Sequence, residues 1–216
     1  MDSICLSAFV QGLSCLTELS IADCNLSHLP SEIGSLISLE MLNLGRNNLT
    51  ALPDTFFNLA SLKELYMNDC SVTQLPGQIE RLVSLEYLGL GGNNLLSLPD
   101  TVCNLTCLKT LDLYDCNVSH LPDGIGRLVS LVHLNLAQNS LHTLPDSLCN
   151  LTSLECLYLQ DCNLTYLPSE IERLISLKTL DLDGNKCICL PKSICYLPCL
   201  KVLHLPHCNW RFVANN

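Results

Sequence analysis

Residues 85–107 read LEYLGLGGNNLLSLPDTVCNLTC, and residues 108–130 read LKTLDLYDCNVSHLPDGIGRLVS. Both segments place leucine at positions 1, 4, 6, 14 and 21 of a 23-residue unit, with proline at position 15. Leucines at positions 4 and 6 are separated by one residue that is not a large apolar one, which is typical of a short strand with one buried face. Because equivalent strands separated by a whole 23-residue coil run in the same direction, each unit is expected to add one strand to a parallel sheet.

The same unit extends along the whole chain of 216 residues, which contains 50 leucines. Eight of the ten prolines recur every 23 residues, at Pro30, Pro53, Pro76, Pro99, Pro122, Pro145, Pro168 and Pro191. Residues 16–199 form eight full units, and residues 1–15 and 200–216 form partial ones. A single unit cannot bury its leucine face alone, whereas stacked units share one core. We therefore expect residues 1–216 to form a single domain.

The shared pattern LxxLxLxx(N/C)x(L/V)xxLPxx(I/V/L/F)xxLxx resembles that of leucine-rich repeats. Its LPxxIxxL segment resembles intracellular Ras-group and Scribble/Erbin-type repeats, and residues 23–39, DCNLSHLPSEIGSLISL, also resemble repeats of plant disease-resistance receptors. This resemblance implies an α/β fold: a leucine-rich repeat solenoid, or horseshoe, with a concave parallel β-sheet of about nine strands and short helical turns on the convex side.

Two positions of the unit suggest how its loops are held. Position 16 is Ser or Asp in six of the eight units, so we expect these residues to be N-caps, with Ser169 and Glu172 forming a capping box. Position 9 alternates strictly between two residue types along the chain. Its members are Cys24, Asn47, Cys70, Asn93, Cys116, Asn139, Cys162, Asn185 and Cys208. Since an amide both donates and accepts, we expect the asparagine coils to be better hydrogen-bonded than the cysteine coils.

Composition argues against several classes of protein. The net charge is −10 with only 11 Lys and Arg and no basic block, so we expect no nucleic-acid partner. No run of about 20 apolar residues is present, so we expect no membrane span. The first residues lack a basic segment followed by an apolar run, and the 15 cysteines are an odd number in a fairly long chain. We therefore expect reduced thiols and a cytoplasmic location.

Cysteine and histidine residues suggest two possible sites, a zinc site and a catalytic cysteine, but the repeat register disfavours both. A zinc site is conceivable near the C-terminus, yet the register disperses its ligands, so we expect no metal and no cofactor. These candidate ligands are Cys187, Cys189, Cys195, Cys199, His204, His207 and Cys208. Cys156 lies one unit from His133, which we interpret as a surface thiol beside a surface imidazole, since a catalytic cysteine requires an electropositive setting. We expect no enzyme activity.

The sheet face carries the strongest indication of function. The core positions are monotonous, whereas positions 2, 3, 5, 7 and 8 vary from unit to unit, as a recognition surface requires. Tyrosine is enriched at protein interfaces, and carboxylates between tyrosines suit a partner with a basic patch. The expected partner-binding residues are Glu64, Tyr66, Tyr87, Asp112, Tyr114, His133, Asn135, Tyr158, Asp161, Asp181 and Asp183.

Two functions remain open at this point. The first is a non-catalytic protein–protein interaction module, an intracellular signalling scaffold or adaptor that binds its partner on the concave face. The second is the ligand-sensing repeat segment of a larger immune receptor of the disease-resistance type. Neither end of the repeat region carries a polar capping unit. The chain is therefore expected to be an excerpt of a longer array, or to self-associate end to end through its uncapped termini.

Overall fold

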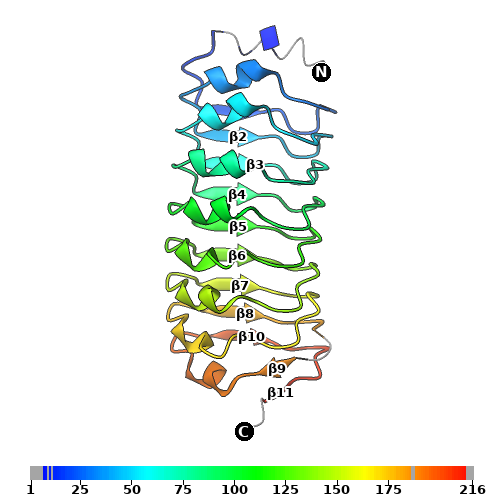
Figure 1. Ribbon diagram of the computed structural model, residues 1–216, viewed down its shortest axis with the longest axis vertical. Coiled ribbons are helices and arrows are strands. Elements are labelled where there is room, and N and C mark those ends of the chain that lie inside the picture. Colours follow the sequence, from blue (N-terminus) through cyan, green and yellow to red (C-terminus); the bar gives the residue numbers. More distant parts are fainter. Residues whose placement is uncertain (1–6, 9, 11, 186–187, 213–216) are drawn as a thin grey trace.

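The chain forms an elongated stack of coils in which the strands lie in one layer and the helical turns in another (Figure 1). This computed structural model describes residues 7–8, 10, 12–185 and 188–212. Each coil contributes one strand of three residues to a nine-stranded parallel sheet, in chain order. The strands are β1 Glu18–Ser20, β2 Met41–Asn43, β3 Glu64–Tyr66, β4 Tyr87–Gly89, β5 Thr110–Asp112, β6 His133–Asn135, β7 Cys156–Tyr158, β8 Thr179–Asp181 and β10 Val202–His204. The predicted solenoid with about nine parallel strands is confirmed.

Strand register follows the 23-residue period without slippage. Leu88, at the centre of β4, pairs with Leu65 of β3 and Leu111 of β5, and all three side chains are fully buried. The flanking residues of each strand point to the other face, because side chains alternate along a strand. One leucine layer therefore forms the continuous core, and one varied layer covers the outer face of the sheet.

The convex side consists of 3-10 helices of three to five residues. These are η1 Ser31–Ser35, η2 Asp54–Asn58, η3 Gly77–Arg81, η4 Asp100–Asn104, η5 Ile125–Arg127, η6 Asp146–Asn150, η7 Ile171–Arg173 and η8 Lys192–Tyr196. Apolar residues at positions 18 and 21, such as Ile33 and Leu36, are buried under each turn. Across the described ranges, no helix is long and apolar enough to cross a membrane.

The predicted N-caps at position 16 are wrong. In six helices the residue before the first turn is the position-15 proline, and none of the eight helices has a side-chain cap. At η1, Pro30 has φ −69° and ψ 151°, and its carbonyl accepts the N–H of Ile33 at 3.1 Å. Proline fixes φ and supplies the first acceptor, so position 16 is already inside the turn. Ser169 and Glu172 form no capping box, because Glu170 precedes η7.

The asparagines at position 9 make more hydrogen bonds than the cysteines, as predicted, but some of their partners differ from those expected. Asn93 makes five side-chain hydrogen bonds: its Oδ1 accepts two N–H groups, and its Nδ2 donates to three carbonyl groups. The Cys116 thiol donates to the Leu90 carbonyl at 3.1 Å and to the Tyr114 carbonyl at 3.5 Å. The asparagines are therefore the better-bonded residues. The N–H groups they accept, however, belong to the preceding cysteine coil rather than to their own loop.

The loop backbone shows why the two kinds of coil alternate. Position 8 has positive φ in all nine coils, at Asp23, Arg46, Asp69, Gly92, Asp115, Gln138, Asp161, Gly184 and His207. In four cysteine coils position 10 has positive φ as well, at Asn25, Ser71, Asn117 and Asn163. Asn, Asp and Gly adopt this left-handed conformation most readily. Two successive coils, 46 residues in all, therefore form a repeating unit of backbone conformation as well as of sequence.

The C-terminal end departs from the regular pattern. Two short strands, β9 Cys189–Leu190 and β11 Arg211–Phe212, form a separate parallel pair beside the main sheet. The outermost strand β10 leaves Leu203 37% exposed, whereas its equivalent in β8, Leu180, is fully buried. Trp210 and Phe212 pack edge to face at 5.7 Å and remain about half exposed.

Candidate protein-binding face

The structure places most of the expected partner-binding residues on the outer face of the sheet. Position 3 of the strands carries Glu64, Tyr87 and His133, and position 5 carries Tyr66, Asp112, Asn135, Tyr158 and Asp181. Tyr114 and Asp183 follow their strands at position 7. Asp161, at position 8, lies in the next turn with φ 52° and so forms the edge of the face.

Two of the predicted tyrosines form a stacked pair near the middle of the sheet. The rings of Tyr66 in β3 and Tyr87 in β4 lie 4.5 Å apart at 32° to each other. The pair depends on Gly89, which is the register partner of Tyr66. A Cβ atom at Gly89 would lie 3.0 Å from Cε1 of Tyr87 and 2.7 Å from Oδ1 of Asn68. Glycine at this point therefore makes room for the Tyr87 ring to lie along its own strand.

The surroundings of this tyrosine pair are acidic. The hydroxyl of Tyr66 donates to Oε2 of Glu64 at 2.8 Å. Burial, together with that bond, raises the pKa of Tyr66 to about 12. Burial also raises the pKa of Tyr87, with the charges of Asp112 and Glu64 adding to the effect. Both phenols therefore stay neutral at physiological pH, and the negative charge of the patch comes from the carboxylates.

Several polar residues at position 5 also hold the loop that follows their strand. Oδ1 of Asp112 accepts the N–H of Tyr114 at 3.1 Å, and Oδ1 of Asn135 accepts the N–H of Ala137 at 3.2 Å. Such a bond from a side chain to the backbone two residues on is the usual Asx turn. Each of these side chains therefore has one oxygen engaged in the fold, which the sequence pattern alone did not indicate.

Asp181 is the most embedded of the expected site residues, at 8% exposure. Its Oδ2 accepts from Nε2 of Gln160 at 2.8 Å and lies 3.0 Å from Nδ1 of His204. In the adjacent loop, Oδ1 of Asp183 lies 2.9 Å from Nδ1 of His207. These contacts tie the last coil to β8. Gln160, at position 7, and His204, at position 5, also lie on the face. Neither was among the residues expected from the sequence, although both stand at repeat positions of the face.

The net charge of this face is negative. Positions 3, 5, 7 and 8 of the nine units hold nine carboxylates and one basic side chain, Arg46, and position 2 adds three carboxylates and four lysines. The nine carboxylates are Glu18, Asp23, Glu64, Asp69, Asp112, Asp115, Asp161, Asp181 and Asp183. Those of position 2 are Glu40, Glu86 and Glu155, which pair with Lys63, Lys109 and Lys178, and the fourth lysine is Lys201. Arg46 lies 3.9 Å from Asp23, at one end of the row. The middle of the face therefore offers aromatic rings and unpaired negative charge together.

The cysteines and histidines considered for catalysis or zinc binding lie on different parts of the solenoid. Strand register places the exposed His133 beside the half-exposed Cys156. Burial raises the pKa of the ladder thiol of Cys162 to about 12, which disfavours the reactive thiolate. Within the described residues no three His, Cys, Asp or Glu side chains are arranged to hold a metal ion. Cys187, one of the conceivable zinc ligands, lies outside those residues.

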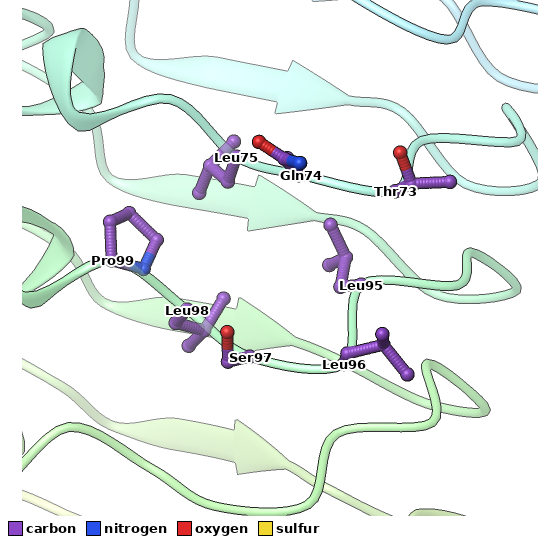
Figure 2. A pocket seen from close by; sticks show the side chains of 8 residues that line it. All are labelled: Thr73, Gln74, Leu75, Leu95, Leu96, Ser97, Leu98 and Pro99. Carbon is purple, nitrogen blue, oxygen red and sulfur yellow. The ribbon is translucent and has the colours of Figure 1, made fainter.

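A hollow of about 390 Å³ lies elsewhere, between the third and fourth coils (Figure 2). It is lined by residues between strand and helix: Thr73, Gln74, Leu75, Leu95, Leu96, Ser97, Leu98 and Pro99. Of these, Leu75, Leu95 and Leu98 are core residues, while Leu96 is 60% exposed. The hollow is a seam between neighbouring coils and contains no charged side chain that could act in catalysis.

Comparisons with known proteins agree with this architecture. The family description "Leucine-rich repeat region" matches residues 4–88 and 74–162, and "Leucine Rich Repeat" matches residues 153–174. More than half of the chain is covered, so the chain belongs to the leucine-rich repeat family. No curated protein matches it in sequence.

Three solved structures illustrate the range of its relatives. A leucine-rich repeat protein of Leptospira interrogans is 31% identical, with a TM-score of 0.75, over 96% of this chain and 59% of that one. The leucine-rich repeat domain of the type III effector XopL is 32% identical, with a TM-score of 0.74, over 91% and 71% of the two chains. The plant peptide hormone receptor RGFR1, solved in complex with RGF2, is 31% identical, with a TM-score of 0.81, over 92% and 33%. This chain therefore spans 59% of the Leptospira protein and a third of the plant receptor.

Proposed function

We propose that this chain is a non-catalytic protein-interaction module whose outer sheet face binds a protein partner with a basic patch. The observation that carries the proposal is the stacked pair of Tyr66 and Tyr87, bordered by Glu64 and Asp112. An arginine or lysine over an aromatic face is attracted by the ring, and a neighbouring carboxylate strengthens the contact. Twelve carboxylates against five basic side chains on this face favour such a partner over an acidic one.

A cytoplasmic scaffold or adaptor in signalling is the role we favour. It is supported by the way in which cysteine is used inside the fold. The thiols of Cys70, Cys116 and Cys162 are buried, and each donates to a carbonyl group of the preceding coil at 3.0–3.1 Å. A thiol that performs this structural task must stay reduced, which a cytosolic environment favours.

A ligand-sensing role within a larger receptor is the second candidate. It is favoured by the 31% identity to a plant peptide hormone receptor that was solved with its ligand, over 92% of this chain. In that case the same face would receive a peptide or protein signal, in innate immunity for example. A transcript that joins these repeats to a nucleotide-binding or kinase domain would favour this role over the adaptor role.

Quantitative affinity capture tests the proposed face directly. The bait carries Tyr87→Ala, Tyr114→Ala and Tyr158→Ala together, and partners are compared with those of the wild type by mass spectrometry. A matched control carries Tyr166→Ala and Tyr196→Ala, because these tyrosines are 47% and 75% exposed and lie outside the face. The proposal predicts that specific partners are lost from the triple variant and retained by the control. Partners retained by both variants would contradict it.

A further inference from the structure

A row of exposed aliphatic side chains follows one edge of the solenoid, away from the proposed binding face. Position 22 of the cysteine coils is occupied by Ile37, Val83, Val129 and Ile175, which are 60%, 59%, 54% and 53% exposed. Each lies in the turn that leads from a 3-10 helix back to the next strand, at the edge from which the strand arrows start in Figure 1. Branched aliphatic residues are usually buried, so a regular row of exposed ones indicates an interaction surface. We call these four residues the aliphatic row.

Small or uncharged residues fill the spaces within the row. In the asparagine coils position 22 is Ala60, Thr106, Thr152 or Pro198, and all four are exposed. Position 23, the next residue, is serine or cysteine in every full unit: Ser38, Ser61, Ser84, Cys107, Ser130, Ser153, Ser176 and Cys199. Large and small side chains thus alternate from coil to coil, and no charged residue at positions 22 and 23 interrupts them.

The charges beside the row largely cancel one another. Position 2 of the following coils forms three ion pairs, Glu40 with Lys63 at 2.8 Å, Glu86 with Lys109 at 2.6 Å and Glu155 with Lys178 at 2.6 Å. The chain as a whole has a net charge of −10, which opposes the approach of two copies. Because the pairs neutralise this edge locally, the repulsion between two copies is weaker here than at the acidic sheet face.

We propose that this edge is the interface of a weak antiparallel homodimer. The aliphatic residues recur every second coil, about 9.6 Å apart at strand spacing, and a second copy of the chain offers the same spacing. A two-fold axis between the fourth and fifth units sets each branched side chain opposite a smaller or less protruding one. The opposed pairs are Ile37 with Pro198, Ile175 with Ala60, Val83 with Thr152 and Val129 with Thr106. Such a self-complementary contact is the rule for symmetric dimers.

The dimensions of the edge indicate how tightly the two copies would bind. Eight stacked turns are separated by seven intervals of about 4.8 Å, so the edge is roughly 34 Å long. With a width of about 12 Å, it buries roughly 400 Å² on each copy, about half of a standard interface. A contact of this size belongs with weak, transient interfaces, so we expect a dissociation constant in the micromolar to millimolar range. An axis perpendicular to the sheet leaves both outer sheet faces open on the same side, so dimerisation presents two binding faces together.

Sedimentation equilibrium between about 10 µM and 1 mM tests the proposal, a range chosen to suit the expected dissociation constant. The test variant is Val83→Glu with Val129→Glu, the two members nearest the axis. The matched control is Leu96→Glu, because Leu96 is also 60% exposed but lies between strand and helix beside the seam in Figure 2. The wild type and the control should dimerise with the same constant, and the double variant at least tenfold more weakly. Unchanged thermal unfolding of the double variant shows that its fold is retained.

Three results would overturn the proposal. The wild type could remain monomeric throughout, or the double variant could dimerise as the wild type does. Alternatively, association could be lost in Trp210→Glu with Phe212→Glu while persisting in the double variant, which would place the contact at the exposed terminal coil. Since the aliphatic row lies apart from the tyrosine pair, the triple tyrosine variant should dimerise normally. Failure of this proposal is therefore distinguishable from failure of the proposed binding face.

Discussion

Oδ1 of Asn93 accepts the main-chain N–H of Cys70 at 3.1 Å, although the two residues lie 23 positions apart in the sequence. The same oxygen accepts the N–H of Val72 at 2.9 Å, and Nδ2 donates to the carbonyls of Met67 and Leu90 at 2.8 and 2.6 Å. One buried amide thus closes its own loop and holds the preceding one. The solenoid is therefore built from pairs of coils, each clamped by an asparagine.

Removal of this clamp should cost more stability than removal of the thiol in the next coil. Asn93→Ala removes the acceptor of two buried N–H groups, those of Cys70 and Val72, and the Nδ2 donor to the Met67 carbonyl, so we expect a loss of about 3 kcal/mol in the free energy of unfolding. Cys116→Ala removes a small apolar group and one weak donor, and we expect a loss of about 1 kcal/mol. Urea unfolding followed by circular dichroism measures both. An equal or larger loss at Cys116 would contradict this account of the alternation.

The turns of the convex side also meet closely within a pair. A Cβ atom on Gly34 of η1 would overlap the carbonyl oxygen of Thr55 and lie 2.8 Å from its Cβ. Gly34→Ala should therefore separate two coils and destabilise the protein by about 2 kcal/mol. Gly77→Ala is the matched control, since its nearest neighbour would be Oγ1 of Thr101 at 3.7 Å. Thermal unfolding should distinguish the two variants, and equal midpoints would show that the first contact relaxes freely.

The tyrosine pair depends on a single glycine, which gives a sharp test of the site. Gly89→Ala should push the Tyr87 ring away from Tyr66, because the new methyl group would lie 3.0 Å from Cε1 of Tyr87. We expect the affinity for a basic partner to fall about tenfold, or about 1.4 kcal/mol. Isothermal titration calorimetry measures this, with thermal unfolding as the control for folding. Full affinity in a folded Gly89→Ala protein would remove the tyrosine pair from the site.

Thiol reactivity should follow burial. Burial raises the pKa of Cys116 and Cys149 to about 11 and that of Cys162 to about 12, so little thiolate forms at pH 8. Because the thiolate is the nucleophile, these residues should react with iodoacetamide far more slowly than the exposed Cys107 and Cys199. Mass spectrometry of a labelling time course would show the order. Rapid labelling of Cys162 in the folded protein would indicate that its coil opens readily.

Periodicity alone predicted the sheet, its parallel register and the buried leucine layer, because one pattern recurs in register along the whole chain. It did not predict how the turns begin. The residue type at position 16 indicated a cap, but proline one position earlier already fixes the backbone, as at Pro30. The pair β9 and β11 was also missed, because it arises where the last coil departs from the repeat.

The sequence predicted which repeat positions lie on the sheet face, but not which side chains contact one another there. The register identified Tyr66 and Tyr87 as face residues, whereas their stacking depends on the missing side chain of Gly89. Asp181 is of a type expected to be exposed, yet Gln160 and His204 from the flanking coils leave it nearly buried. Such neighbours lie 21 or 23 residues away, so their side-chain geometry becomes visible only in three dimensions.

The central claim is that the sheet face binds basic protein segments through its tyrosine pair. Its most direct test is a fluorescence anisotropy titration with ten-residue peptides that alternate serine with arginine or with glutamate. Tyr66→Ala with Tyr87→Ala is compared with the control Tyr166→Ala with Tyr196→Ala, and neither changes the net charge. The account predicts that the arginine peptide binds the wild type and the control, weakens with added salt, and binds the first variant about tenfold more weakly. Equal binding of both peptides, or equal binding of the arginine peptide to both variants, would contradict it.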